Sequence, residues 1–228
     1  MNAKQRAAEA ALKFVSDGMI VGLGTGSTID YFLQALGAAL RDGRLKDICG
    51  VPTSRQSERR AEHLGIPTIS LAQAKPDVTI NGADEVAPNL DLIKGLGGAL
   101  LREKLVAQNS KLLVIIADAS KAVPKLGTKS PLPVEVTQFA HEVHPEFFRS
   151  LGAVPALRKT PDGAPYVTDN GNYIYDCRFD GIDDPATLDA QLQIRAGVVD
   201  TGLFVGMASV ALIADDDKVE ERRAPSLR

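Results

Sequence analysis

The sequence contains no tryptophan, two cysteines and few aromatic residues, and each shortage narrows the possible functions. With 5% aromatic residues and a formal net charge of −3, the chain lacks both the stacking side chains and the basic surface that nucleic-acid binding requires. No apolar run approaches the ~20 residues that cross a bilayer, and the amino terminus lacks the apolar core of a signal peptide. We therefore expect a cytoplasmic protein that binds neither nucleic acid nor membranes.

The residues that usually bind metals are also sparse. Cys49 and Cys177 show no paired spacing, which favours free thiols in a reducing compartment over a disulfide framework. His63, His141 and His144 lack the spacing of a metal site. We expect no metal.

Up to about residue 120, short apolar segments alternate with amphipathic ones, a pattern typical of parallel strands joined by crossover helices. The predicted strands lie at residues 19–23, 48–51, 67–70, 78–82 and 111–117, and the predicted helices at 27–40, 54–64 and 98–109. The first half of the chain is therefore expected to form an α/β domain.

Prolines become frequent after Gly127, and the apolar segments shorten. Strands are predicted at 132–136, 173–178, 198–200, 203–205 and 209–214, and helices at 145–150 and 185–194. This pattern indicates a small α+β domain over residues 129–201, inserted before the last strand of a main domain that comprises 1–128 and 202–228. The charged residues 215–228 are expected to form a frayed tail.

A glycine-rich segment, Gly22-Leu23-Gly24-Thr25-Gly26-Ser27-Thr28, stands where the first predicted strand meets its helix. Glycines let the backbone approach a ligand, and a helix start offers free N–H groups and the positive end of its dipole. The segment suits a phosphate monoester, although a tight turn with a Ser or Thr cap explains it equally well. It matches neither a dinucleotide-binding motif nor a nucleotide P-loop, which needs a Lys before the Ser or Thr.

A second cluster, Asn81-Gly82-Ala83-Asp84-Glu85, follows the strand that begins near Val78. Ligands bind at the carboxyl ends of strands in open α/β sheets, so Asp84 could face a ligand. Taken alone, the cluster is better explained by an acidic residue that caps a turn.

The third cluster begins at Lys94, which precedes the glycine-rich turn at 95–98 and the predicted helix that contains Glu103. Taken alone, Glu103 and Lys104 are more typical of a solvated helix surface. Together, however, the three clusters place an anion cradle, an Asp, a Lys and a Glu on loops that a parallel sheet gathers at one edge. Lys121, after the strand predicted at 111–117, either extends into the same cleft or lies on the surface.

Several segments occur here in an order that resembles the ribose-5-phosphate isomerases of type A: GLGTGST, NGADE, KGLGGALLREK, DASK, LPVEV, TDNGN and GVVDTGLF. The similarity extends from about Lys4 to Ile213. It implies an α/β fold with a Rossmann-like, mostly parallel sheet, helices on both faces and a small α+β domain, assembled as a homodimer or homotetramer. It also implies a cofactor-free isomerase that interconverts ribose 5-phosphate and ribulose 5-phosphate in pentose phosphate metabolism.

The resemblance assigns roles to individual residues. It implies that Glu103 is the general base of a reaction through a cis-enediolate, that Lys94 and the backbone at 95–98 stabilise the oxyanion, and that Asp84 assists ring opening. Glu103 is expected to be shielded from water. The implied substrate-binding residues are Lys4, Thr25, Gly26, Ser27, Thr28, Asn81, Gly82, Ala83, Asp84, Lys94, Gly95, Gly97 and Lys121.

Two positions depart from the family pattern. Asn81 replaces the first Asp of the usual DGAD motif, and an amide cannot exchange a catalytic proton, which argues against an acid–base role at this position. Leu96 replaces a usual Gly and could shift the nearby backbone donors. A sugar-phosphate sensor that has lost the chemistry therefore remains an alternative, as does a related aminosugar-phosphate deaminase or coenzyme A transferase.

Overall fold

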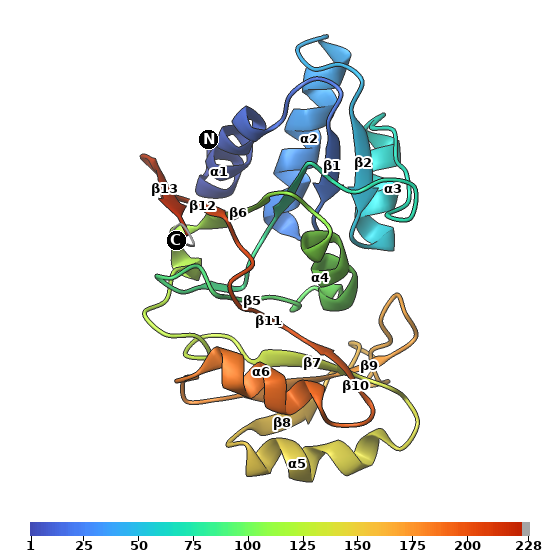
Figure 1. Cartoon of the computed structure of the whole chain (residues 1–228), viewed down its shortest axis with the longest axis vertical. Helices are drawn as coiled ribbons and strands as arrows, with labels where there is room; N and C mark the ends of the chain where they lie inside the picture. Colours follow the sequence, from blue (N-terminus) through green and yellow to red (C-terminus); the bar gives the residue numbers. More distant parts are fainter. Residues whose placement is uncertain (225–228) are drawn as a thin grey trace.

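A computed structural model describes residues 1–224, whose strands form three sheets (Figure 1). The largest sheet has the order β13 (Val219–Arg223), β12 (Val210–Ala214), β6 (Leu113–Asp118), β3 (Val78–Asn81), β1 (Ile20–Leu23) and β2 (Cys49–Pro52). All neighbours in it pair in parallel except β12 and β13. The predicted α/β fold with a mostly parallel sheet is therefore confirmed.

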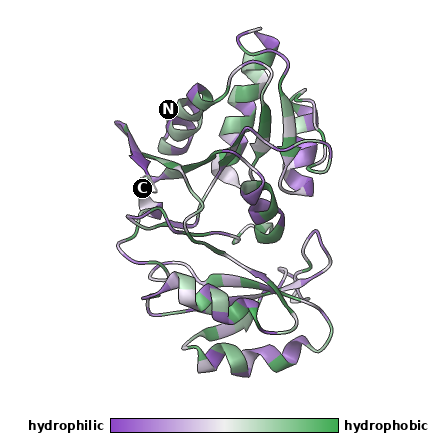
Figure 2. Cartoon of the chain, in the orientation of Figure 1, coloured by the Kyte–Doolittle hydropathy of each residue, from purple (hydrophilic) through white to green (hydrophobic). Residues whose placement is uncertain are grey.

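Both faces of the large sheet are covered, because successive side chains of a strand point to opposite faces. Val114 and Ile116 of β6 pack in a core with α1 (Ala3–Ala11) and α2 (Ser27–Arg41). Ile115 belongs to a second core, to which α4 (Leu100–Gln108) contributes Ala107. Figure 2 shows hydrophobic residues along the central strands of this sheet.

A separate four-stranded sheet, the small sheet, occupies the lower part of Figure 1. Its order is β10 (Val198–Thr201), β7 (Leu132–Val136), β9 (Tyr173–Arg178) and β8 (Val154–Leu157). It packs with α5 (His144–Ser150) and α6 (Pro185–Gln193) around Phe148 and Leu192, in a core that also includes Ile93 and Leu203 from outside this sheet. We propose that residues 129–201 form the small α+β domain, with boundaries that stay predictions.

A three-stranded antiparallel sheet of β11 (Leu203–Phe204), β5 (Leu92–Ile93) and β4 (Glu85–Val86) lies between the two larger sheets (Figure 1). Strands of two residues leave no periodic signal, so β4 and β5 were not expected from the sequence. The remaining elements are α3 (Arg55–His63) and the short 3₁₀ helices η1 (Leu12–Phe14), η2 (Ala119–Lys121) and η3 (His141–Val143).

Two sequence predictions are wrong. No strand forms at 67–70, where a single bridge joins Thr68 to Gly50 before the chain turns at Ser70. The expected frayed tail instead contains β13, which pairs with β12 along its whole length. Its sequence, Val-Glu-Glu-Arg-Arg, resembles a solvated tail because an edge strand can be polar on both faces (Figure 2). Residues 225–228 of that tail lie outside the described part.

Local sequence explains where the helices near the candidate site begin. Gly26 has φ 123°, a backbone conformation that favours glycine, and α2 starts at the next residue. Ser54 caps α3 by accepting from the backbone N–H of Ser57. α4 begins at Leu100 rather than at Gly98, because Gly98 has φ 80° and cannot continue into a right-handed helix. None of the helices within residues 1–224 has the length and apolar character needed to span a membrane.

Candidate active site

Three loops surround a cavity of about 120 Å³ at the carboxyl ends of β1 and β3. They are the turn after β1, the loop after β3 and the glycine-rich turn between β5 and α4; α1 and η2 complete the wall. The lining residues are Lys4, Thr25, Gly26, Ser27, Thr28, Ile29, Gly82, Ala83, Asp84, Lys94, Gly95, Gly97, Glu103 and Lys121. Every residue expected at the site lines this cavity except Asn81, which is fully buried beneath the turn.

The turn at 24–28 presents the start of α2 to the cavity. The Nζ atom of Lys4, on α1, lies 2.9 Å from Oγ of Ser27, so a cation and a hydroxyl meet at this helix start. Gly24 is required by close approach, because a Cβ there would lie 2.3 Å from Oδ1 of Asn81. An ammonium, a hydroxyl and helix N–H groups together favour an anionic group.

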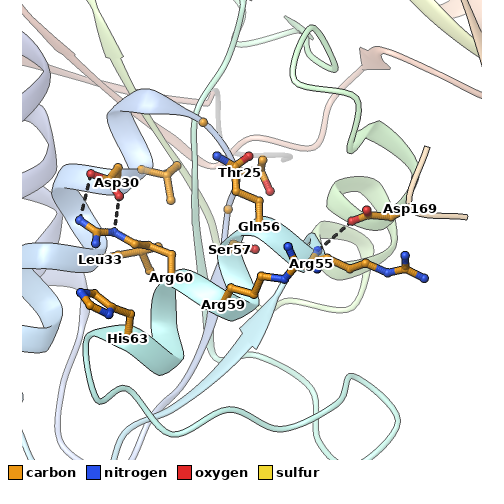
Figure 3. Close-up of a pocket in the computed structure, with 13 residues that line it drawn as sticks. Thr25, Asp30, Leu33, Arg55, Gln56, Ser57, Arg59, Arg60, His63 and Asp169 are labelled. Carbon is orange, nitrogen blue, oxygen red and sulfur yellow. Dashed lines mark hydrogen bonds and ion pairs between the residues drawn. The ribbon is translucent and has the colours of Figure 1, made fainter. Parts of the chain in front are cut away.

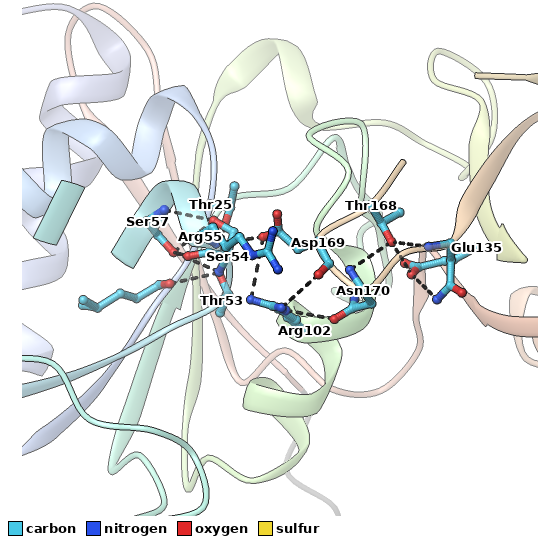
Figure 4. Close-up of polar contacts among 12 residues, drawn as sticks. Thr25, Thr53, Ser54, Arg55, Ser57, Arg102, Glu135, Thr168, Asp169 and Asn170 are labelled. Carbon is cyan, nitrogen blue, oxygen red and sulfur yellow. Dashed lines mark hydrogen bonds and ion pairs between the residues drawn. The ribbon is translucent and has the colours of Figure 1, made fainter. Parts of the chain in front are cut away.

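Thr25 differs from its neighbours because its hydroxyl is already engaged. Its Oγ1 lies 2.8 Å from both Oγ1 of Thr53 and Oγ of Ser54, at the end of β2 and the start of α3 (Figure 4). Thr53 and Ser54 therefore support the turn from behind. Neither residue was expected at the site from the sequence, although a Ser before a helical segment is itself a capping signal.

Asn81 holds the loops together. Its Oδ1 accepts from the backbone N–H of Gly82 at 2.8 Å and of Thr25 at 3.3 Å. Its Nδ2 is buried and has no hydrogen-bond partner among the described residues. The side chain thus acts through its carbonyl oxygen, as a support for the turn.

Lys94 and Glu103 form a buried ion pair at the cavity. Nζ of Lys94 lies 2.9 Å from Oε1 of Glu103, and the two side chains are 3% and 4% exposed. The same ammonium donates to the carbonyl of Gly82 and lies 5.5 Å from the centre of the Phe204 ring. The expectation that Glu103 is shielded from water is confirmed, and the solvated-surface alternative is excluded for this residue.

The glycine-rich turn is braced from two sides. Oδ2 of Asp84 accepts from the backbone N–H of Leu96 at 3.0 Å, and the side chain of Leu96 is 40% exposed. The Leu at this position therefore points away from the cavity. From the small sheet, Arg158 donates to the carbonyls of Gly95 and Leu96 at 3.0 and 3.1 Å. Gly98 lies against Tyr166, whose pKa is raised by burial.

A larger pocket of about 540 Å³ lies between α2 and α3, on the other side of Thr25 and Gly26 (Figure 3). Three arginines of α3 line it, and Arg60 among them is paired with Asp30 at 2.5 Å. The Lys94–Glu103 pair lines the smaller cavity and not the larger pocket, whose titratable residues include His63 and Asp30. In residues 1–224, no cluster of three His, Cys, Asp or Glu side chains is arranged to hold a metal ion.

Comparisons with known proteins agree on one family. The family model described as "Ribose 5-phosphate isomerase A (phosphoriboisomerase A)" matches residues 49–218. Relatives named ribose-5-phosphate isomerase A include one from Roseiflexus sp. strain RS-1, 51% identical over 99% of this chain and 97% of its own, and one from Deinococcus radiodurans, 48% identical over 96% of each.

Solved structures give the same result. A D-ribose-5-phosphate isomerase in complex with phospho-erythronic acid matches with TM-score 0.95 and 40% identity over 98% of this chain and 100% of its own. The ribose 5-phosphate isomerase of Plasmodium falciparum matches with TM-score 0.93 and 41% identity over 96% of this chain and 97% of its own.

Proposed function

The chain belongs to the ribose 5-phosphate isomerase A family and is an isomerase of ribose 5-phosphate, and from this premise we propose that Glu103 is its general base. The observation that supports this role is the buried Lys94–Glu103 pair beside a turn suited to phosphate. Glu103 is the carboxylate that lies within 2.9 Å of an ammonium in this cavity, so base and electrophile are already adjacent.

In the proposed reaction, the Glu103 carboxylate removes the proton from C2 of the open-chain aldose. The electron pair moves through the C1–C2 bond to the carbonyl oxygen and gives a cis-enediolate. Glu103 then returns the proton to C1, while a proton moves from the hydroxyl at C2 to the oxygen at C1, and ribulose 5-phosphate results. The reaction involves no net oxidation or reduction, and the reverse reaction uses the same groups.

Stabilisation of the developing oxyanion is assigned to Lys94 and to backbone N–H donors of the glycine-rich turn. Two of those donors are already occupied, because the N–H of Leu96 donates to Asp84 and the N–H of Gly98 donates to the carbonyl of Gly95. We therefore assign the N–H groups of Gly95 and Gly97, which line the cavity, to this role.

The phosphate is assigned to the turn at 25–28, with Lys4 and Lys121 as its cations. Holding the phosphate there fixes C1 and C2 relative to the base, which converts binding energy into orientation. Asp84 is assigned to ring opening through Oδ1, because its Oδ2 already braces the turn. Asn81 supports the turn and exchanges no proton.

We also propose that the protein acts in the cytoplasm as a homodimer or homotetramer, within pentose phosphate metabolism and without a cofactor. Size-exclusion chromatography with light scattering would measure the assembly. A monomer would contradict this part of the proposal and leave the isomerase mechanism unaffected.

The mechanism is tested by Glu103→Gln, assayed by ketose formation from ribose 5-phosphate. The expected loss in kcat is about 10²-fold or more, because the amide cannot accept the proton. Competition by inorganic phosphate should persist, since the turn at 25–28 is unchanged. Glu146→Gln, on the exposed side of α5, is the matched control and should retain full activity. More than a few per cent of residual activity would remove Glu103 as the base, and a wild-type protein without turnover would favour a sensor.

A further inference from the structure

The helix α4 has three consecutive charged residues, Arg102, Glu103 and Lys104, and the proposed mechanism uses only Glu103. Arg102, Glu103 and Lys104 resemble a solvated helix surface, yet Glu103 and Lys104 are both buried. Burial of charged side chains is costly unless each is paired and hydrogen-bonded. The partners of Arg102 and Lys104 therefore need an explanation beyond solubility.

Lys104 is held by the strand β10 of the small sheet. Its Nζ donates to Oδ1 of Asp200 at 2.6 Å and to the carbonyl of Thr201 at 2.8 Å. It also lies 5.1 Å from the centre of the Phe204 ring, the ring that Lys94 approaches at 5.5 Å. The flank of α4 at Lys104 is thus fixed to the connection between the small sheet and the three-stranded sheet.

Arg102 is held by a different part of the small sheet, the loop before β9. Its Nε donates to Oδ1 of Asn170 at 2.9 Å, and its Nη2 donates to the carbonyl of Asp169 at 3.1 Å (Figure 4). The carboxylate of Asp169 also accepts from the backbone N–H of Arg55 at the start of α3, at 2.8 Å. The loop therefore contacts α4 and α3 together.

The loop itself rests on a buried carboxylate. Oε1 of Glu135, on β7, accepts from the hydroxyl of Thr168 at 2.9 Å and from the amide of Asn172 at 2.8 Å (Figure 4). Glu135 is fully buried and Thr168 is 5% exposed. The loop that contains the acceptors for Arg102 is therefore hydrogen-bonded to β7 on either side of those acceptors. A positioning contact requires such support.

Successive residues of an α-helix point about 100° apart, so Arg102 and Lys104 diverge on either side of Glu103. Anchoring both flanks fixes the rotation of α4 about its axis. Rotation is what sets the direction of the Glu103 carboxylate, and a misplacement of about 1 Å can cost about 10²-fold in rate.

We propose that Arg102 and Lys104 are positioning residues that aim Glu103 at the substrate by clamping α4 to the small sheet, through Asn170 and Asp169 on one flank and Asp200 on the other. This inference rests on the proposed role of Glu103 as base. It gives functions to residues of the REK, TDNGN and GVVDTGLF segments that do not touch the cavity.

The test uses Arg102→Gln, because Arg102 is the more exposed of the two and its loss leaves no buried charge unpaired. We expect kcat to fall about tenfold or more, while KM and the inhibition constant of inorganic phosphate change less than about twofold. Asn170→Ala should lower kcat in the same way. The double variant should be no slower than Arg102→Gln alone, because both changes remove one contact. Arg149→Gln, an exposed residue of α5, is the matched control.

The second flank is tested with the pair Lys104→Met and Asp200→Asn together, which removes both buried charges at once and should lower kcat with KM retained. Unchanged kcat in Arg102→Gln, additive losses in the double variant, or a change in KM in place of kcat would overturn the proposal. Turnover by Glu103→Gln would overturn the base assignment itself, so the two failures are distinguishable.

Discussion

Oδ1 of Asn81 lies 3.3 Å from the backbone nitrogen of Thr25, so the residue that ends β3 holds the turn that follows β1. The same oxygen accepts from Gly82 at 2.8 Å. One side-chain oxygen therefore fixes two of the loops that surround the cavity. Its Nδ2 has no hydrogen-bond partner within residues 1–224.

For Asn81→Asp we expect kcat to be unchanged or higher, because the carboxylate keeps the oxygen that accepts from Thr25 and Gly82. The second oxygen would carry a buried charge when ionised. The melting temperature of the variant relative to the wild type should therefore be lower at pH 8 than at pH 5. Asn81→Ala is the control, and loss of the acceptor should raise KM. A large loss of kcat in Asn81→Asp would mean that the site is adapted to the amide.

Lys94→Met should abolish turnover and also destabilise the fold, by about 3–5 kcal/mol, because it leaves the Glu103 carboxylate buried without its cation. The double variant Lys94→Met with Glu103→Gln removes both charges and should recover most of that stability in urea unfolding while staying inactive. Equal stability of the single and double variants would contradict the coupling of this pair.

Gly98→Ala should reduce both activity and stability. Gly98 has φ 80°, and a Cβ there would lie 2.2 Å from the hydroxyl oxygen of Tyr166. Gly163→Ala is a matched control, because Gly163 has φ 88° and nothing within 4 Å of its Cβ position. The control measures the left-handed backbone cost alone, about 1–2 kcal/mol. Gly98→Ala should cost about 1–3 kcal/mol more and lower kcat; equal unfolding free energies would contradict the clash.

Glu135→Gln should stabilise the protein more at high pH than at low pH. Burial raises the pKa of Glu135, against the hydrogen bonds of Asn172 and Thr168 that lower it. The native state thus binds this proton more tightly than the unfolded state, and the contribution of Glu135 to the free energy of unfolding falls as pH rises above about 4.5, the ordinary value.

Gln keeps the accepting oxygen and carries no charge, so the difference in melting temperature between Glu135→Gln and the wild type should grow from pH 4.5 to pH 8. Glu146→Gln, an exposed change in α5, should show no such trend. Parallel pH curves for Glu135→Gln and the wild type would show that the Glu135 carboxylate is not a stability determinant.

The alternation of apolar and amphipathic segments was sufficient to predict the parallel sheet and the positions of β1, α2, β3 and β6 to within two residues. A parallel sheet has its loops at a common edge, so the residues at 25–28 and at 81–84 had to meet there. The same reasoning failed for β13, because its alternation is polar and its pairing depends on β12 being an available edge.

The sequence by itself determined which chemical groups stand at the edge of the sheet, since glycine, lysine and carboxylate positions follow from strand ends alone. Only the tertiary structure decided that Glu103 is buried against Lys94. The charged pattern of α4 is compatible with water on every side, and the hydrogen-bond partners of Arg102 and Lys104 lie far along the chain. Arg102 reaches Asn170 across 68 residues and Lys104 reaches Asp200 across 96, separations over which no local periodicity carries information.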